Sequence, residues 1–110
     1  MLRNISRNMI LAERPYLALG YWRRAFGMIG KQFKDFDALI IPRCRAIHTW
    51  FMSQPLDLIF VNQERKVLGL EIAVKPWRMV IGPPTTHDVI ELPPHKLCGI
   101  LVEHNDILEW

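Results

Sequence analysis

Apolar and polar residues alternate along much of this chain, which is the pattern of strands that bury one face. The alternation is clearest from Val67 to Val74, where every second side chain is a large aliphatic one. Denser apolar runs predict further strands at Met9–Glu13, Ala38–Ile41, Asp88–Leu92 and Ile107–Leu108. Polar or proline-rich segments predict turns between strands, at Asn62–Arg65 and Gly82–Thr86.

A helical period occurs at two places. From Leu19 to Phe33 the apolar side chains form one stripe, which predicts the main helix. A short second helix is predicted after Pro93 or Pro94, with Leu97, Ile100 and Leu101 as its apolar stripe. The chain has 110 residues, so we expect one domain, 1–110. The predicted fold class is α+β: a strand-rich, curved or barrel-like antiparallel sheet with one main helix and a short second helix.

The segment Pro42–Met52 runs through a short polar stretch into the apolar residues 58–61, which predicts a β-hairpin. His48 and Asp57 would lie on opposite arms of this hairpin. With a three-residue loop they project from opposite faces, and with a four-residue loop they stand about 13 Å apart. Neither register makes a catalytic dyad. We therefore expect Asp57 to accept backbone N–H bonds at the turn, and His48 to be a half-buried histidine with its hydrogen bonds satisfied.

Metal-binding spacings are absent from the sequence. Cys44 and His48 are four residues apart, but on a strand this places them about 13 Å apart, too far for one ion. There is no Cys-x-x-Cys and no His-Glu-x-x-His motif. We expect no metal and no cofactor, and Cys44 and Cys98 are expected to be reduced thiols.

Trp77 and Arg78 follow Pro76, which ends the strand before them. On a rigid turn, such a pair can hold an anionic or planar group by stacking and bidentate hydrogen bonding. The alternative is structural: Trp77 covers the end of the barrel, and Arg78 bonds a carbonyl or an acid.

The positive charge is concentrated at the N-terminal end. Residues 1–34 hold seven Arg and Lys against one acid, although the whole chain has a net charge of only +3. This third could dock on a membrane or nucleic acid, or it could be a solvated helix face. No nucleic-acid motif accompanies it, so nucleic acid is an unlikely partner. No apolar run reaches the roughly 18 residues of a transmembrane segment and no signal peptide is recognisable, so we expect a cytoplasmic protein unless an export segment has been removed.

Several segments resemble, in order, the motifs of a bacterial and archaeal family catalogued as domain of unknown function 192, or uncharacterised protein family 0127. They are Arg24–Lys31, Ala38–Cys44, Ile47–Asp57, Val74–Arg78 and Asp88–Pro93, of which Ile47–Asp57 is the closest match. Two departures come late: Pro94-His95 stands where the family usually has Ala-Gly, and Asn105-Asp106 where it has Gly-Asp. The family is defined by similarity rather than by an activity, so the resemblance implies a fold and a candidate site but no reaction.

Three functions are open. The first is a small non-enzymatic binding module that presents five residues to a small anionic ligand or a protein segment: His48, Trp50, Asp57, Trp77 and Arg78. The second is an enzyme, a hydrolase or transferase using Cys44 or His48, with the Cys44 thiolate favoured by Arg43 and Arg45. The third is docking through the basic N-terminal third.

Overall fold

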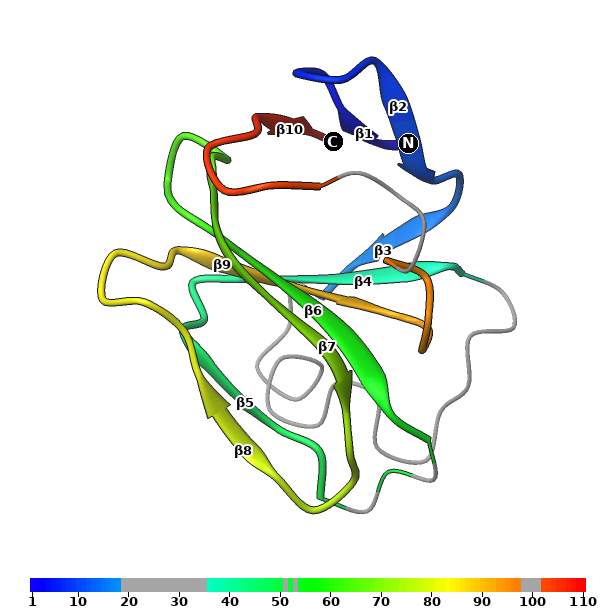
Figure 1. Ribbon diagram of the computed structural model, residues 1–110, viewed down its shortest axis with the longest axis vertical. Coiled ribbons are helices and arrows are strands. Elements are labelled where there is room, and N and C mark those ends of the chain that lie inside the picture. The colour runs from blue at the N-terminus through cyan, green and yellow to red at the C-terminus, as the bar shows by residue number, and fades with distance from the viewer. Residues whose placement is uncertain (19–35, 51, 53, 98–101) are drawn as a thin grey trace.

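The computed structural model of the chain describes residues 1–18, 36–50, 52, 54–97 and 102–110 (Figure 1). Strands dominate this part of the chain. Their bounds are β1 (Leu2–Asn4), β2 (Met9–Ala12), β3 (Pro15–Leu17), β4 (Ala38–Pro42), β5 (Ala46–His48), β6 (Leu56–Val61), β7 (Val67–Val74), β8 (Met79–Ile81), β9 (Asp88–Leu92) and β10 (Leu108–Glu109). The strands predicted at 67–74 and 88–92 are confirmed with the same bounds.

The described strands form three sheets. A central sheet has the order β3-β4-β9-β6-β7, a three-stranded sheet has the order β10-β1-β2, and β5 pairs with β8. In Figure 1 the three-stranded sheet lies with both termini at one end of the molecule, and the β5–β8 pair lies at the other end. The prediction of one antiparallel sheet is therefore wrong: there are three, and β3 runs parallel to β4.

The central sheet has an apolar core on each face. Ile59 and Ile90 pair across β6 and β9, and they belong to the core shared with the three-stranded sheet. Their neighbours Leu58 and Val89 face the opposite side, where they cluster with Ile47 of β5. Burial on both faces explains why successive residues are apolar at 38–41 in β4, 58–61 in β6 and 89–90 in β9.

The α+β class with a main helix is wrong, because the described residues contain no helix and are strand-rich. The predicted main helix, Leu19–Phe33, lies outside the described residues. The described start of the second predicted helix is a turn at 94–97, where Lys96 N–H donates to Pro93 C=O at 3.2 Å; Ile100 and Leu101 lie outside the described residues. His95 has φ 67°, a left-handed conformation that an α-helix does not contain, and Leu97 N–H bonds a side chain instead of a helical carbonyl.

The predicted hairpin between Pro42–Met52 and 58–61 is also wrong. β5 pairs with β8, with His48 opposite Met79, and does not pair with β6. β6 lies inside the central sheet, with β9 on one edge and β7 on the other, so it has no edge left for β5. In contrast, the turn predicted at Asn62–Arg65 does join a hairpin, between β6 and β7.

Replacing His95 with glycine should raise the melting temperature by about 2–6 °C. A side chain in the left-handed region costs roughly 1–2 kcal/mol, and glycine gives back about 0.4–1 kcal/mol through its freer unfolded chain, so the net gain is about 0.5–1 kcal/mol. Thermal unfolding measures it. His104→Gly is the matched control, because His104 is also exposed but has no positive φ, and this variant should lose stability. Equal losses in both variants would contradict strain at His95.

Candidate functional site

Thr49 directly follows β5 and holds the loop between β7 and β8 in place by hydrogen bonds. It is fully buried. Its hydroxyl donates to Lys75 C=O at 2.6 Å and accepts the Arg78 N–H at 2.9 Å. Thr49 N–H donates to Arg78 C=O at 2.8 Å, and Trp77 N–H donates to Thr49 C=O at 3.0 Å. Residues 75–78 are thus held at a fixed place against the end of β5.

Sequence reasoning did not single out Thr49. The signal was present in the parity of the strand, because side chains alternate between faces. Ile47 is buried and Trp50 is exposed, so Thr49 falls on the inner face with Ile47. A buried hydroxyl on a strand must find partners, and here the partners are the backbone groups of the loop.

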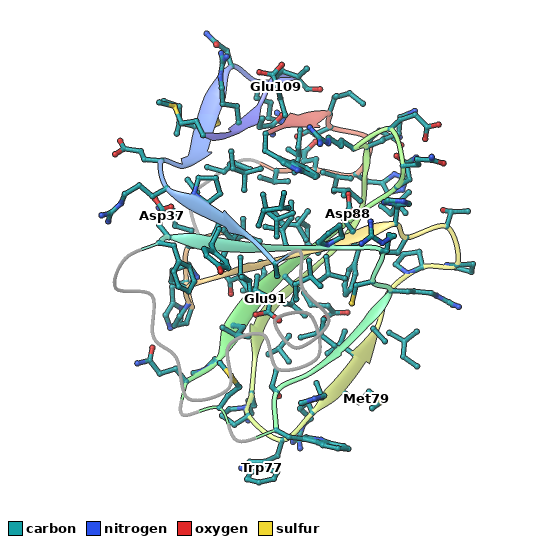
Figure 2. All side chains as sticks on the ribbon, turned by 180° about the vertical axis from the view of Figure 1, so that it is seen from behind. Asp37, Trp77, Met79, Asp88, Glu91 and Glu109 are labelled. Carbon is teal, nitrogen blue, oxygen red and sulfur yellow. The ribbon has the colours of Figure 1, made fainter. Side chains whose placement is uncertain are left out.

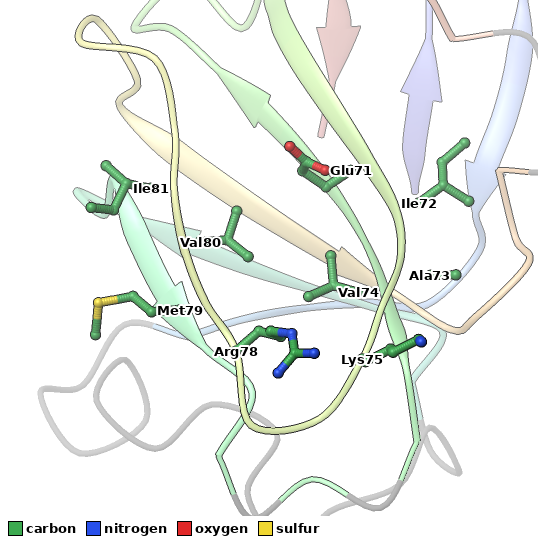
Figure 3. Close-up of a pocket in the computed structure, with 9 residues that line it drawn as sticks. All are labelled: Glu71, Ile72, Ala73, Val74, Lys75, Arg78, Met79, Val80 and Ile81. Carbon is green, nitrogen blue, oxygen red and sulfur yellow. The ribbon is translucent and has the colours of Figure 1, made fainter.

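A groove opens between β7 and β8 (Figure 3). It has a volume of about 510 Å³ and is lined by residues 71–75 and 78–81. Figure 3 shows Glu71, Val74, Arg78 and Val80 between the two strands. The middle of the groove is therefore aliphatic, and charged groups lie toward its ends.

Two cations lie where the loop closes the groove. Lys75 and Arg78 are both exposed, and neither side chain has a partner among the described residues. Arg78 is held by its own backbone bonds to Thr49, so its guanidinium projects from a fixed point. Glu71 lies four residues before Lys75 and lines the other part of the groove (Figure 3). The groove thus has a cationic end and an acidic end.

Exposed aromatic side chains lie next to Thr49 and Arg78 in the sequence, outside the lining of the groove. Trp77 is 58% exposed and Trp50 is 41% exposed, and the Trp50 ring lies 4.9 Å from the His48 ring. Figure 2 shows Trp77 at one tip of the molecule, at the opposite end from Glu109. Trp77 has φ 64°, which is rare for a bulky residue and is found more often where a turn serves a function. Of the five predicted site residues, only Arg78 lines the groove; His48 and Trp50 flank Thr49, whose backbone bonds Trp77 and Arg78.

A family model described as "Uncharacterized ACR", the domain of unknown function 192, matches residues 15–110. An uncharacterised protein family 0127 protein from Pyrococcus furiosus is 32% identical over 111 residues, which cover 97% of this chain and 95% of that protein. This chain belongs to the domain-of-unknown-function 192 family. A relative from Pyrococcus horikoshii is 29% identical over 114 residues, covering 100% of this chain and 98% of that protein.

Two solved structures share the fold of this family member. One is a protein of unknown function from Novosphingobium aromaticivorans, with a TM-score of 0.77, 21% identity, and coverage of 87% of this chain and 74% of that one. The other is a putative transcription regulator from Sinorhizobium meliloti, with a TM-score of 0.77, 18% identity, and coverage of 86% and 79%. At these identities the likeness shows the fold alone. The family has no established function.

Asp57 is not part of the site of this family member. Its side chain is fully buried, and its carboxylate accepts the N–H groups of Ala73 at 2.8 Å and Leu97 at 2.9 Å. It does accept backbone bonds, as expected, but the donors come from β7 and from the turn after β9 rather than from its own turn. Across from Asp57, β7 holds one residue more than β6, and Ala73 in this bulge has φ 54°. Asp57 therefore fixes the bend of β7 that forms one wall of the groove.

The residues that an enzyme would use have other contacts in this family member. Cys44 is half-buried, and its Sγ–H donates to Ala46 C=O at 3.1 Å. His48 is half-buried as predicted, but its Nδ1 has no hydrogen-bond partner in the described part of the chain. The structure does pair His87 Nδ1 with Asp88 Oδ1 at 2.8 Å, which the sequence did not predict. Among the residues described, no three His, Cys, Asp or Glu side chains are grouped so that they could hold a metal ion.

The basic N-terminal third of this family member is partly neutralised where the structure describes it. Arg3 lies 3.8 Å from Glu109, and Arg7 lies 2.7 Å from both Glu103 and Asp106. Burial tends to raise the pKa of Asp106, but hydrogen bonds from Asn4, the Glu103 N–H and Arg7 lower it on balance. The cations Arg23, Arg24, Lys31 and Lys34 lie outside the described residues. No helix in the described ranges is long and apolar enough to span a membrane.

Proposed function

We propose that this protein is a small non-enzymatic binding module, and that its β7–β8 groove binds a carboxylate through Lys75 and Arg78. The observation that carries the proposal is the pair of cations without a partner among the described residues, placed at the closed end of a groove of about 510 Å³. Ligand sites commonly have volumes of about 300–1,000 Å³, with apolar walls and a few fixed polar groups.

The chemistry of the two side chains favours a carboxylate. A guanidinium offers two parallel N–H donors that match the two oxygens of a carboxylate, and an ammonium adds a second charge. The backbone of Arg78 is already held by Thr49, so less freedom is lost on binding. The aliphatic walls at Val74 and Val80 suit an apolar group attached to the carboxylate.

The simplest probe is N-acetyl-valine, with N-acetyl-valine amide as the neutral comparison. At about 0.3 kcal/mol per non-hydrogen atom, we expect a Kd on the order of millimolar for the acid. At ten times Kd, the acid should add about 1.4 kcal/mol of stability, which raises the melting temperature by several degrees. Thermal unfolding and a ¹H–¹⁵N titration measure the two effects, and the amide should produce neither.

Matched variants identify the site. Arg78→Gln and Lys75→Gln should each weaken binding of the acid about tenfold, because each removes one charge-assisted contact. Arg14→Gln and Lys66→Gln remove an exposed cation elsewhere and should leave binding unchanged. Equal binding of acid and amide, or acid binding that Arg78→Gln does not weaken, would overturn the proposal.

A further inference from the structure

We infer that the groove holds an extended peptide, added as a strand beside β7 with its C-terminal carboxylate at Arg78. This inference rests on the proposed function and deepens it by naming the partner. The first observation that supports it concerns the connection between β7 and β8. Strands joined by a four-residue loop ordinarily pair with one another, but β7 and β8 do not. Thr49 ties their loop to β5, and β8 pairs with β5 instead.

Among the described strands, β7 and β8 therefore each keep one edge without a strand partner. β7 is the last strand in the order of the central sheet, and β8 has one strand neighbour, β5. From Leu68 to Val74 the outer edge of β7 has no backbone hydrogen bond to any other described residue, whereas Val67 bonds Asn105 and Asp106. An exposed edge of this length is a template for another strand, and adding a peptide strand is a common mode of recognition.

Charge sets the direction of the peptide. A C-terminal carboxylate at Lys75 and Arg78 makes the peptide run parallel to β7 and antiparallel to β8. Glu71 lies four residues before Lys75 on the bulged strand β7, so it would face a side chain about three residues before the carboxylate. A Lys or Arg at that position would complement Glu71, and aliphatic residues between would lie against Val74 and Val80. The partner is thus a C-terminal segment with a basic residue followed by aliphatic ones.

The test compares three peptides with the whole chain. The first is acetyl-Arg-Ala-Val-Val with a free carboxylate. The second ends in an amide, and the third carries a methyl group on one internal peptide nitrogen, which removes a donor that strand pairing needs. We expect the first peptide to bind about tenfold more tightly than N-acetyl-valine. The amide should lose about a hundredfold, because it lacks both charge-assisted contacts, and the methylated peptide should lose about tenfold. Amides on the outer edge of 68–74 should also gain protection from hydrogen exchange when the first peptide is bound.

Each other outcome contradicts strand addition, carboxylate binding or the peptide as the occupant of the groove. If the methylated peptide and N-acetyl-valine bind as tightly as the first peptide, strand addition is wrong and carboxylate binding stands. If neither free acid binds, both proposals are wrong. If the β7 edge is already protected without peptide and the chain is a dimer in solution, the occupant is a second copy and the peptide inference is wrong. Arg78→Gln should reduce the difference between acid and amide about tenfold, and Arg14→Gln should leave it unchanged.

Discussion

Asp57→Asn should lower the free energy of unfolding by about 2–4 kcal/mol. The Asp57 carboxylate is fully buried and accepts one backbone N–H at each oxygen, from Ala73 and Leu97. An amide has one acceptor oxygen, so one of these N–H groups would face an NH₂ group and lose its partner. A hydrogen bond to a charged group contributes about 1.5–3 kcal/mol, and an orphaned buried donor costs about 1–3 kcal/mol. Urea unfolding measures the change.

Asp37→Asn is the matched control. Its carboxylate also accepts two backbone N–H bonds, from Glu13 and Arg14, each at 2.8 Å. These bonds are exposed, so water can replace a lost acceptor, and we expect a loss of about 1 kcal/mol or less. Losses of the same size in both variants would show that burial is not what makes Asp57 important. Asp57→Ala should be more damaging than Asp57→Asn, because both donors lose their partner.

The role of Asp57 also shows how far sequence reasoning reaches. The alternation of side chains in the predicted hairpin places Asp57 away from His48. Backbone N–H groups are therefore the expected partners of the Asp57 carboxylate. The sequence could not identify the donors, because Ala73 and Leu97 lie 16 and 40 residues further along the chain. Strands at 67–74 and 88–92 were predictable because alternation and apolar runs are local signals. Pairing between distant segments depends on which edges remain free, and the sequence does not display that.

The candidate site, too, is predictable from the sequence only where the signal is local. Trp77 and Arg78 follow a proline that marks a turn, so their place on a loop was readable. β8 is not predictable from the sequence, because three consecutive apolar residues are too few to show a period. Without β8 the sequence predicts no groove, and it predicts no hydrogen-bond partner for the Thr49 hydroxyl. The anchoring of the loop by Thr49 depends on β5 pairing with β8, a contact that the hairpin prediction had assigned elsewhere.

Raising the pH from 5 to 9 should destabilise the protein by several kcal/mol through Glu91 alone. Glu91 lies in β9, is 3% exposed, and its Oε2 has no hydrogen-bond partner in the described part of the chain. Figure 2 shows it within the sheet, far from the tip at Trp77. Burial in this apolar setting disfavours the charged form and raises the pKa of the carboxyl from 4.5 to about 8.

The sign follows from proton binding. Between pH 4.5 and about 8 the folded protein keeps the Glu91 proton and the unfolded chain releases it, so each rise in pH favours unfolding. One pH unit corresponds to about 1.4 kcal/mol, so the accumulated loss is on the order of 4 kcal/mol and is complete above the folded pKa. The lowered pKa of Asp106 acts in the opposite direction, with stability lost as the pH falls, and its effect lies at acidic pH.

Glu91→Gln should remove this dependence, because an amide does not titrate and has nearly the same shape as the protonated acid. We expect the variant to match the wild type near pH 5 and to exceed its stability by about 4 kcal/mol at pH 9, as measured by urea unfolding at pH 5, 7 and 9. Glu64→Gln is the control, because Glu64 lies exposed in the β6–β7 turn, and it should keep the wild-type slope. If wild type and Glu91→Gln lose stability in parallel, then Glu91 is ionised in the folded protein and a cation or donor must stabilise its charge.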